Sequence, residues 1–338
     1  MNKIKKNTYS LKWSKLNLLG GCILILLGNF SCSYKAQEKE RSLEDRKVIQ
    51  QQVEPQALFP YPEIPAMLIR PDEREAYLVV HYWDNFNFAD TLLINNKNVT
   101  EQGVADYLAI LGKETVKKED LKESLENFCS RLEQQAHARK ILLQIMENYL
   151  YNPNSPFYNE KLYALFLERM INSKYVDAVR KSSLQFHLQL INRNTPGHKA
   201  TDFVYYLQDG SKCTLYQTKI RGNRLLLVFY DPECSSCHEV MQEMVRDNLL
   251  KQAVETGYLT ILAIYTEGNL EVWKHTLDKL PEEWIVGCDR EVIKEHTLYD
   301  LKAMPSLYLL DADKIVLLKD ASYNKICREL QDRLNPVE

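Results

Sequence analysis

The apolar residues of this chain change their spacing near Asn194. From about Leu43 to Arg193 they recur every three or four residues, which is the period of helices with one buried face. After Asn194, short apolar runs typical of strands alternate with further helical stretches. We therefore expect a mostly α-helical part followed by an α/β part.

The first half contains five stretches with helical spacing. They span residues 71–86, 100–111, 118–150, 159–171 and 177–191. Thr100 stands directly before an apolar stripe, so we expect it to be an N-cap. The stretch 118–150 fits either one long helix or two, and "PNSPF" after it breaks the pattern. No strand pattern of comparable strength interrupts this half, which predicts a small all-helical domain.

Strands and helices alternate in the second half, after the linker-like stretch "NTPGHKATDF". A hairpin is predicted at 203–216 around Asp209-Gly210, and the continuous apolar run 224–231 suits a buried central strand. We expect further strands at 258–266 and 284–289, and a strand, a turn and a strand over 305–318. Helices are expected after the cysteine pair through Leu249 and at 269–280, 290–301 and 324–334. These elements predict an α/β fold with a mixed sheet.

Composition describes a folded protein with no general affinity for nucleic acid. The chain has 338 residues, which suits two domains, and 45% of them are hydrophobic. The formal net charge is −3, so nothing favours binding to a polyanion.

The first residues have the order of a secretory signal. Five lysines between positions 3 and 15 precede the apolar run 16–30, and Ser31-Cys32-Ser33 follows. A cysteine at the end of such a run resembles a bacterial lipoprotein signal, in which Cys32 becomes the lipidated first residue. The alternatives are a lipobox ending at Cys22, a plain signal peptide and an uncleaved anchor. The apolar run is short for a membrane span, which needs about 20 residues.

These observations divide the chain into four segments. We predict a lipoprotein-type signal at 1–32, a linker at 33–58, a helical domain of unknown role at 59–193 and an α/β domain at 194–338. The mature protein is then exported, faces the periplasm and is held on a membrane by its lipid. Outside the cytosol disulfides persist, so a thiol there needs a reason to stay reduced.

The stretch "DPECSSCHE" at 231–239 carries the candidate chemistry. A C-x-x-C pair suits a redox dithiol or half of a zinc site, and C-x-x-C-H is also the attachment signature of a c-type haem. Cys234 follows the predicted central strand and starts a helix. A helix N-terminus stabilises a thiolate, the nucleophile in disulfide exchange. Cys234 is therefore predicted to attack and Cys237, one turn further in, to resolve the mixed disulfide.

At this point the chain resembles the thioredoxin fold. The resemblance rests on a strand, C-x-x-C at a helix start, a β-α unit and then "AMPSLYLLD". More narrowly, it resembles the exported TlpA/ResA-type thiol-disulfide oxidoreductases, and it covers about 194–335. This resemblance implies that Pro305, after Met304, is a cis-proline facing the dithiol. The helical half, through "HYWDNFNFAD" at 81–90, resembles an uncharacterised bacterial domain often found before such domains.

Two positions depart from the pattern of that family. Glu233 stands where Trp is usual, and Ser235-Ser236 replaces a pair that often contains Pro. An acid beside Cys234 is expected to raise the pKa of its thiol and to oppose the helix dipole. The direction of electron flow therefore stays open.

The rival chemistries fit less well. His238 would be the axial haem ligand, but in the first turn of a helix on a sheet it is expected to be a surface residue. Cys288 and Cys327 are single, whereas structural zinc sites use closely spaced pairs. A peroxiredoxin-type peroxidase needs Thr and Pro where the chain has Asp231 and Leu227. No cofactor or metal is therefore predicted.

The remaining cysteines have plain interpretations. Cys129 and Cys327 lie among apolar helix positions and are expected to be buried. Cys213 and Cys288 could pair, which the sequence leaves open. The aromatic stretch at 81–90 suits packing at a helix end as well as partner binding.

The sequence thus predicts an exported, lipid-anchored thiol-disulfide oxidoreductase. Its site residues are Cys234, Cys237 and Pro305, and its partners are protein thiols or disulfides and an unidentified redox partner. The alternative function is a partner-binding scaffold lipoprotein whose thioredoxin-like domain is mainly structural.

Overall fold

A computed structural model describes residues 58–334. The predicted signal, Cys22, the lipidation at Cys32 and the linker up to residue 57 lie outside these residues. Residues 58–334 belong to one compact unit, and the domain boundary near 193 stays a prediction. Within 58–334, no helix is both long enough and apolar enough to cross a membrane.

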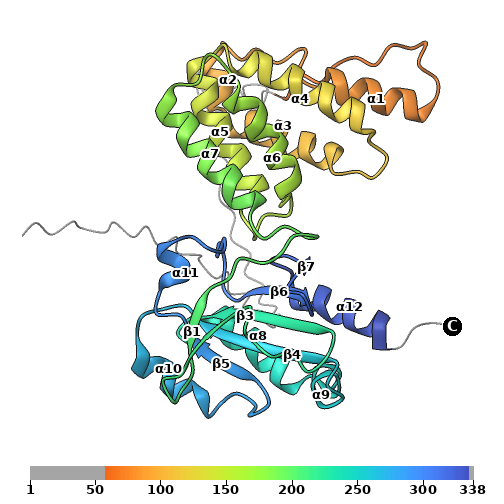
Figure 1. The fold of residues 1–338 in the computed structure, drawn as a ribbon. Helices are drawn as coiled ribbons and strands as arrows, with labels where there is room; N and C mark the ends of the chain where they lie inside the picture. The colour runs from red at the N-terminus through yellow and green to blue at the C-terminus, as the bar shows by residue number, and fades with distance from the viewer. Residues whose placement is uncertain (1–57, 335–338) are drawn as a thin grey trace, which may run out of the picture. The chain divides into compact units, whose positions relative to one another are not determined.

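The first half is helical, as predicted (Figure 1). Its helices are α1 (Pro71–His81), α2 (Thr91–Asn95), α3 (Lys97–Leu111), α4 (Lys118–Leu132), α5 (Ala136–Leu150), α6 (Glu160–Ile171) and α7 (Ala178–Asn192). The stretch 118–150 therefore forms two helices. Helix α2 was not predicted, because five residues are too few to show a helical period.

The N-cap prediction for Thr100 is wrong. Helix α3 begins at Lys97, and the side chain of Asn96 caps it by accepting a hydrogen bond from the Asn98 N–H. Thr100 is fully buried inside the helix, where its hydroxyl donates to the Leu93 carbonyl at 2.8 Å. Asn is at least as good an N-cap as Thr, and it stands one turn earlier.

Aromatic rings form the core of the helical half. Trp83, Phe86 and Phe88 of the 81–90 stretch are all buried. The Trp83 ring lies 4.8 Å from that of Phe128 and 5.4 Å from that of Tyr107, between ring centroids. These three residues of the stretch therefore pack inward, which agrees with aromatic packing, the plainer of the two interpretations of this stretch.

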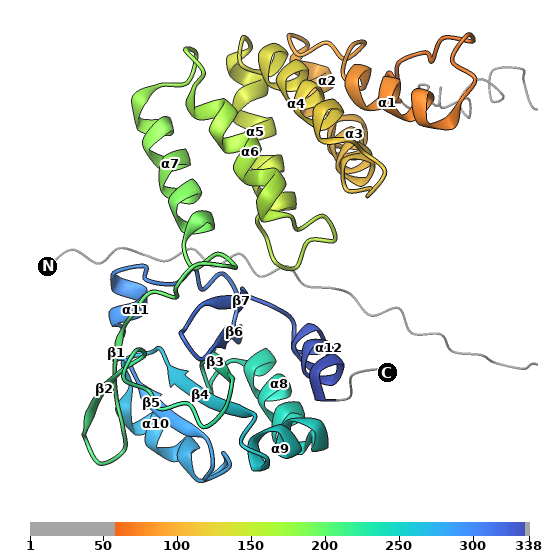
Figure 2. The same ribbon diagram turned by 45° about the vertical axis from the view of Figure 1, so that its right-hand side comes forward.

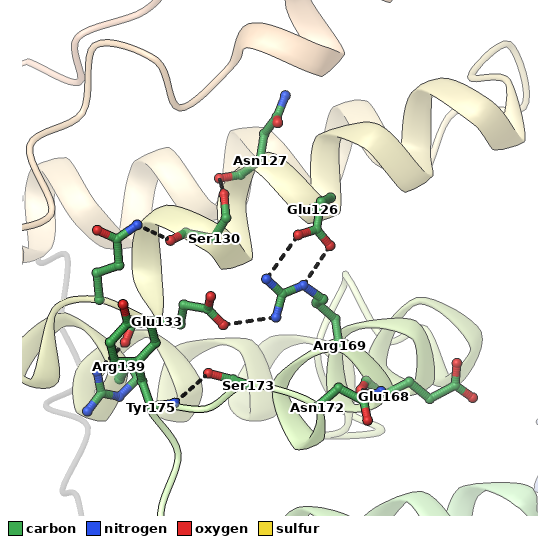
Figure 3. A network of polar contacts seen from close by, with 11 residues as sticks. Glu126, Asn127, Ser130, Glu133, Arg139, Glu168, Arg169, Asn172, Ser173 and Tyr175 are labelled. Carbon is green, nitrogen blue, oxygen red and sulfur yellow. Dashed lines mark hydrogen bonds and ion pairs between the residues drawn. The ribbon is translucent and has the colours of Figure 1, made fainter.

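An ion cluster joins α4 to α6 (Figure 3). The Arg169 guanidinium donates to both carboxylate oxygens of Glu126, at 2.6 and 2.9 Å, and to Glu133 at 2.9 Å. The fork of an arginine matches a carboxylate in this bidentate arrangement. We call these three residues the Arg169 cluster.

The second half contains a seven-stranded mixed sheet in the order β2-β1-β5-β4-β3-β6-β7. Its strands are β1 (Val204–Tyr206), β2 (Lys212–Thr214), β3 (Arg224–Tyr230), β4 (Leu259–Tyr265), β5 (Ile285–Cys288), β6 (Ser306–Asp311) and β7 (Val316–Leu318). Strand β3 lies inside the sheet, parallel to β4 and antiparallel to β6. Every predicted strand is present, with ends shifted by a few residues.

Helices cover both faces of this sheet. They are α8 (Ser235–Arg246), α9 (Asn248–Glu255), α10 (Leu270–Leu277), α11 (Val292–Glu295) and α12 (Tyr323–Leu334). Alternate residues of β3 enter two cores, since side chains of a strand point to opposite faces. One core packs on α8, α9, α10 and α12, and the other packs on α11 and on residues before β1. Figure 2 shows α8, α9 and α12 together beside the sheet.

Two helix predictions in this half need correction. The helix after the cysteines ends at Arg246, because Asp247 starts α9 by accepting hydrogen bonds from the N–H groups of Leu249 and Leu250. The stretch 290–301 is helical only from Val292 to Glu295, with Glu291 (φ 69°) and Thr297 (φ 47°) in the left-handed region at its ends. A left-handed residue ends a helix, and periodicity carries no sign of it.

Candidate functional site

The pairing of β3 with β6 brings the cysteines to Pro305. Phe229, near the end of β3, pairs with Ser306, the first residue of the antiparallel β6. The loop after β3 and the loop before β6 therefore meet at one edge of the sheet. The peptide bond between Met304 and Pro305 is cis, as the resemblance implied.

Cys234 is the N-cap of α8 and is half-buried. Its sulfur lies 3.0 Å from the Ser236 hydroxyl and 3.9 Å from the Met304 carbonyl oxygen. The same hydroxyl donates to the Met304 carbonyl at 2.9 Å. Ser236 thus links the cysteine to the loop before β6.

The pKa of the Cys234 thiol is held below its ordinary value. The hydrogen bond from the Ser236 hydroxyl is the largest cause, and the backbone N–H of Cys237 adds to it, while burial acts in the opposite direction. The expectation that Glu233 raises this pKa is therefore wrong. Glu233 is exposed, so water screens its charge, whereas the two donors touch the sulfur.

Cys237 has the opposite character. Its side chain is 1% exposed, and burial raises the pKa of its thiol to about 12. The backbone N–H of Asp231 donates to its sulfur at 3.4 Å. Both cysteines are free thiols. One turn of helix therefore holds a thiol that ionises readily beside one that stays protonated.

A cavity of about 280 Å³ lies beside the buried cysteine. Tyr230, Cys237, Met241 and Leu280 contribute to its largely apolar lining. His238 also lines it, is exposed, and has its Nε2 2.7 Å from the Gln242 side-chain nitrogen. His238 thus lies on the helix surface, as expected from the sequence.

The other cysteines lie apart from this site. Cys129 is fully buried in the helical core, as predicted, whereas Cys327 is only half-buried. Cys213 on β2 and Cys288 on β5 are free thiols on opposite sides of β1, at the positions paired with Tyr205 and Tyr206. Two strand spacings separate their backbones by roughly 9.6 Å, beyond the reach of a disulfide. In residues 58–334 no group of three or more His, Cys, Asp and Glu side chains is arranged to hold a metal ion.

Two features of the site escaped the sequence reasoning. Ser236 entered only as a departure from a family pattern, although it contacts both Cys234 and Met304. Lys302 carried no motif, yet it is buried among acids two residues before Met304. The position of Lys302, three residues before the predicted site residue Pro305, is a weak signal that could have suggested a role for this lysine.

Comparison with known proteins places the fold. A thioredoxin-like protein from Bacteroides caccae ATCC 43185 is 36% identical and superposes with a TM-score of 0.72, over 81% of this chain and 98% of that one. The chain belongs to the thioredoxin-like proteins. Its predicted fold class, a thioredoxin-like α/β part after a helical part, is thereby confirmed.

Other known proteins are similar to only one part of this thioredoxin-like chain. A family described as a domain of unknown function (DUF5106) matches residues 31–194. The C-terminal domain of an uncharacterized protein from Bacteroides fragilis NCTC 9343 is 39% identical over 40% of this chain and 97% of that one, with a TM-score of 0.39. A thiol-disulfide oxidoreductase from the same strain is 22% identical over 40% of this chain and 99% of that one, with a TM-score of 0.35. The curated proteins contain no match.

Proposed function

We propose that this chain is an exported thiol-disulfide oxidoreductase of the TlpA/ResA type that works through Cys234 and Cys237. One observation carries the proposal. A half-exposed thiol of lowered pKa stands at a helix start, one turn before a buried thiol of raised pKa. Disulfide exchange needs this difference in pKa. The first thiol must attack as a thiolate, and the second must stay protonated until the mixed disulfide has formed.

The reaction follows from these protonation states. The Cys234 thiolate attacks one sulfur of a client disulfide, the client S–S bond breaks, and the other client sulfur leaves as a thiolate that takes a proton from water. Cys237 then gives its proton to water and attacks the Cys234 sulfur, releasing the second client thiolate, which takes up a proton in turn. The client gains two electrons, and the dithiol becomes the Cys234–Cys237 disulfide. The reverse sequence oxidises a client dithiol.

The loop before β6 supplies the surface beside the attacking sulfur. The Met304 carbonyl lies 3.9 Å from the Cys234 sulfur, so a client sulfur bonded there has the Met304–Pro305 backbone as its neighbour. Pro305 has no backbone N–H. The backbone groups available here for an extended client segment are therefore the N–H and the carbonyl of Met304. We therefore assign Pro305 to the site together with the two cysteines.

The place of action rests on the N-terminal sequence. The basic, apolar and small-residue order ending at Cys32 supports export and a lipid anchor on the periplasmic side of a membrane. Mass spectrometry of the mature N-terminus checks this, and an intact signal or an unmodified terminus at another residue refutes it.

A pair of trapping variants tests the exchange itself. Cys237→Ser should accumulate client proteins as mixed disulfides through Cys234, because attack still occurs and release does not. Cys234→Ser should trap few. If both variants trap equally, the roles are wrong. If neither variant changes disulfide reductase activity, the scaffold function replaces the enzymatic one.

A further inference from the structure

Five buried charges lie where the helical half meets the loop before β6. They are Glu160, Asp300, Lys302, Lys319 and Asp320, with side chains between 5% and 17% exposed. The Lys302 ammonium donates to Glu160 at 2.6 Å and to Asp300 at 2.8 Å, and it lies 3.8 Å from Asp320. The second oxygen of Glu160 lies 3.0 Å from the Lys319 ammonium. We call these five residues the Lys302 cluster.

Three helix ends converge on this cluster. Glu160 is the first residue of α6, where the helix dipole favours a negative charge. Tyr151, the residue after α5, donates its hydroxyl to Asp300 at 2.6 Å. Lys319 donates to the Ile191 carbonyl in the last turn of α7 at 2.7 Å, satisfying a carbonyl without a partner in its helix.

The same cluster brackets the Met304–Pro305 pair. Lys302 anchors the chain two residues before Met304. Ser306 anchors it directly after Pro305, by donating its hydroxyl to Asp320 at 2.7 Å. Between these anchors, the Met304 carbonyl accepts the hydrogen bond from Ser236 beside the attacking sulfur. Moving either anchor moves the backbone that faces Cys234.

We propose that Glu160 and Lys302 are positioning residues, through which helix α6 holds loop 302–306 in place beside the dithiol. The proposal rests on the proposed function and gives the helical half a part in it. A buried charge that moves away from its partner is left uncompensated, which is costly, so such a cluster opposes displacement of the loop.

Glu160→Gln tests this with little disturbance. The amide keeps the size of the side chain and removes the charge that ties α6 to the loop. Lys302 keeps its bond to Asp300, whereas Lys319 loses its carboxylate partner and keeps its hydrogen bond to the Ile191 carbonyl. Glu133→Gln in the Arg169 cluster is the matched control (Figure 3). Glu133 is 13% exposed against 17% for Glu160, and Arg169 keeps Glu126 after the change.

The measurement compares two disulfides in the full chain. Reduction of insulin needs a polypeptide segment to lie along the loop, whereas a small aromatic disulfide reagent reaches the Cys234 sulfur without it. In Glu160→Gln the ratio of the two second-order rate constants, insulin over reagent, should fall about tenfold, the effect of losing one charge-assisted contact at the loop. In Glu133→Gln the ratio should stay unchanged. Lys302→Met should lower it at least as much as Glu160→Gln.

Each result has a separate meaning. A general loss of folded protein lowers both rate constants together and leaves the ratio unchanged, so urea unfolding of each variant serves as a check on stability alone. An unchanged ratio in Glu160→Gln, with both reactions abolished in Cys234→Ser, overturns the positioning role and leaves the oxidoreductase standing. An equal fall in Glu133→Gln also overturns it. Activity that persists in Cys234→Ser refutes the proposed function, an oxidoreductase that works through Cys234.

Discussion

Ser236→Ala should slow the reaction of Cys234 at neutral pH. The Ser236 hydroxyl is the leading cause of the lowered pKa of this thiol, and it lies 3.0 Å from the sulfur. In the thiol form the hydroxyl donates to the Met304 carbonyl. A hydroxyl has one proton, so it must release that carbonyl when it turns to the thiolate.

The size of the effect follows from this exchange of partners. A hydrogen bond to a charged group contributes about 1.5–3 kcal/mol, and one between neutral groups about 0.5–1.5 kcal/mol. The difference is about 1 kcal/mol once allowance is made for water reaching this half-exposed sulfur. Because 1.4 kcal/mol is a factor of ten, the acid dissociation constant of the Cys234 thiol should fall roughly fivefold.

Alkylation by iodoacetamide as a function of pH measures it. The variant loses stabilisation of the thiolate, so its Cys234 pKa rises and the rate at neutral pH drops. Above the pKa of both proteins the thiol is fully ionised and the two rates should converge. Ser235→Ala, at the neighbouring exposed serine, is the control. Equal rates in Ser236→Ala and the wild type at neutral pH, or an equal fall in Ser235→Ala, would refute the reasoning.

Three further outcomes are expected. Burial raises the pKa of Cys237 to about 12, so the fraction of its thiolate rises about tenfold per pH unit between pH 7 and about 9. Release of glutathione from a mixed disulfide with Cys234 should accelerate by the same factor, measured in acid-quenched time courses. A rate that does not change with pH contradicts this. Phe128→Ala, in the fully buried aromatic core, should lower the free energy of unfolding in urea by about 3–5 kcal/mol without changing Cys234 alkylation. Gly222→Ala should lower the free energy of unfolding by about 1–3 kcal/mol, because an added Cβ would lie 2.0 Å from the Gly257 carbonyl oxygen. An unchanged free energy of unfolding would mean that the backbone shifts freely at this position.

Much of the fold could be read from local patterns in the sequence. The run 224–231 predicted β3 to within one residue, because a strand buried on both faces needs continuous apolar residues. The pair Cys234 and Cys237 followed it directly, so the position of the dithiol at a strand end and a helix start came from neighbours in the chain. Resemblance to a family added Pro305, which no local pattern connects to the cysteines.

Only the tertiary structure decided which distant groups meet. Ser236 and Met304 are 68 positions apart, and Glu160 and Lys302 are 142 apart. Hydrophobic periodicity reports which side of an element is buried, and capping signals report a single helix turn. Neither carries information about the partner of a buried charge. The pKa of Cys234 is a local case by contrast: Glu233 in the sequence predicted a rise, and the Ser236 hydroxyl and the Cys237 N–H, within three residues, lower it because the helix start brings them to the sulfur.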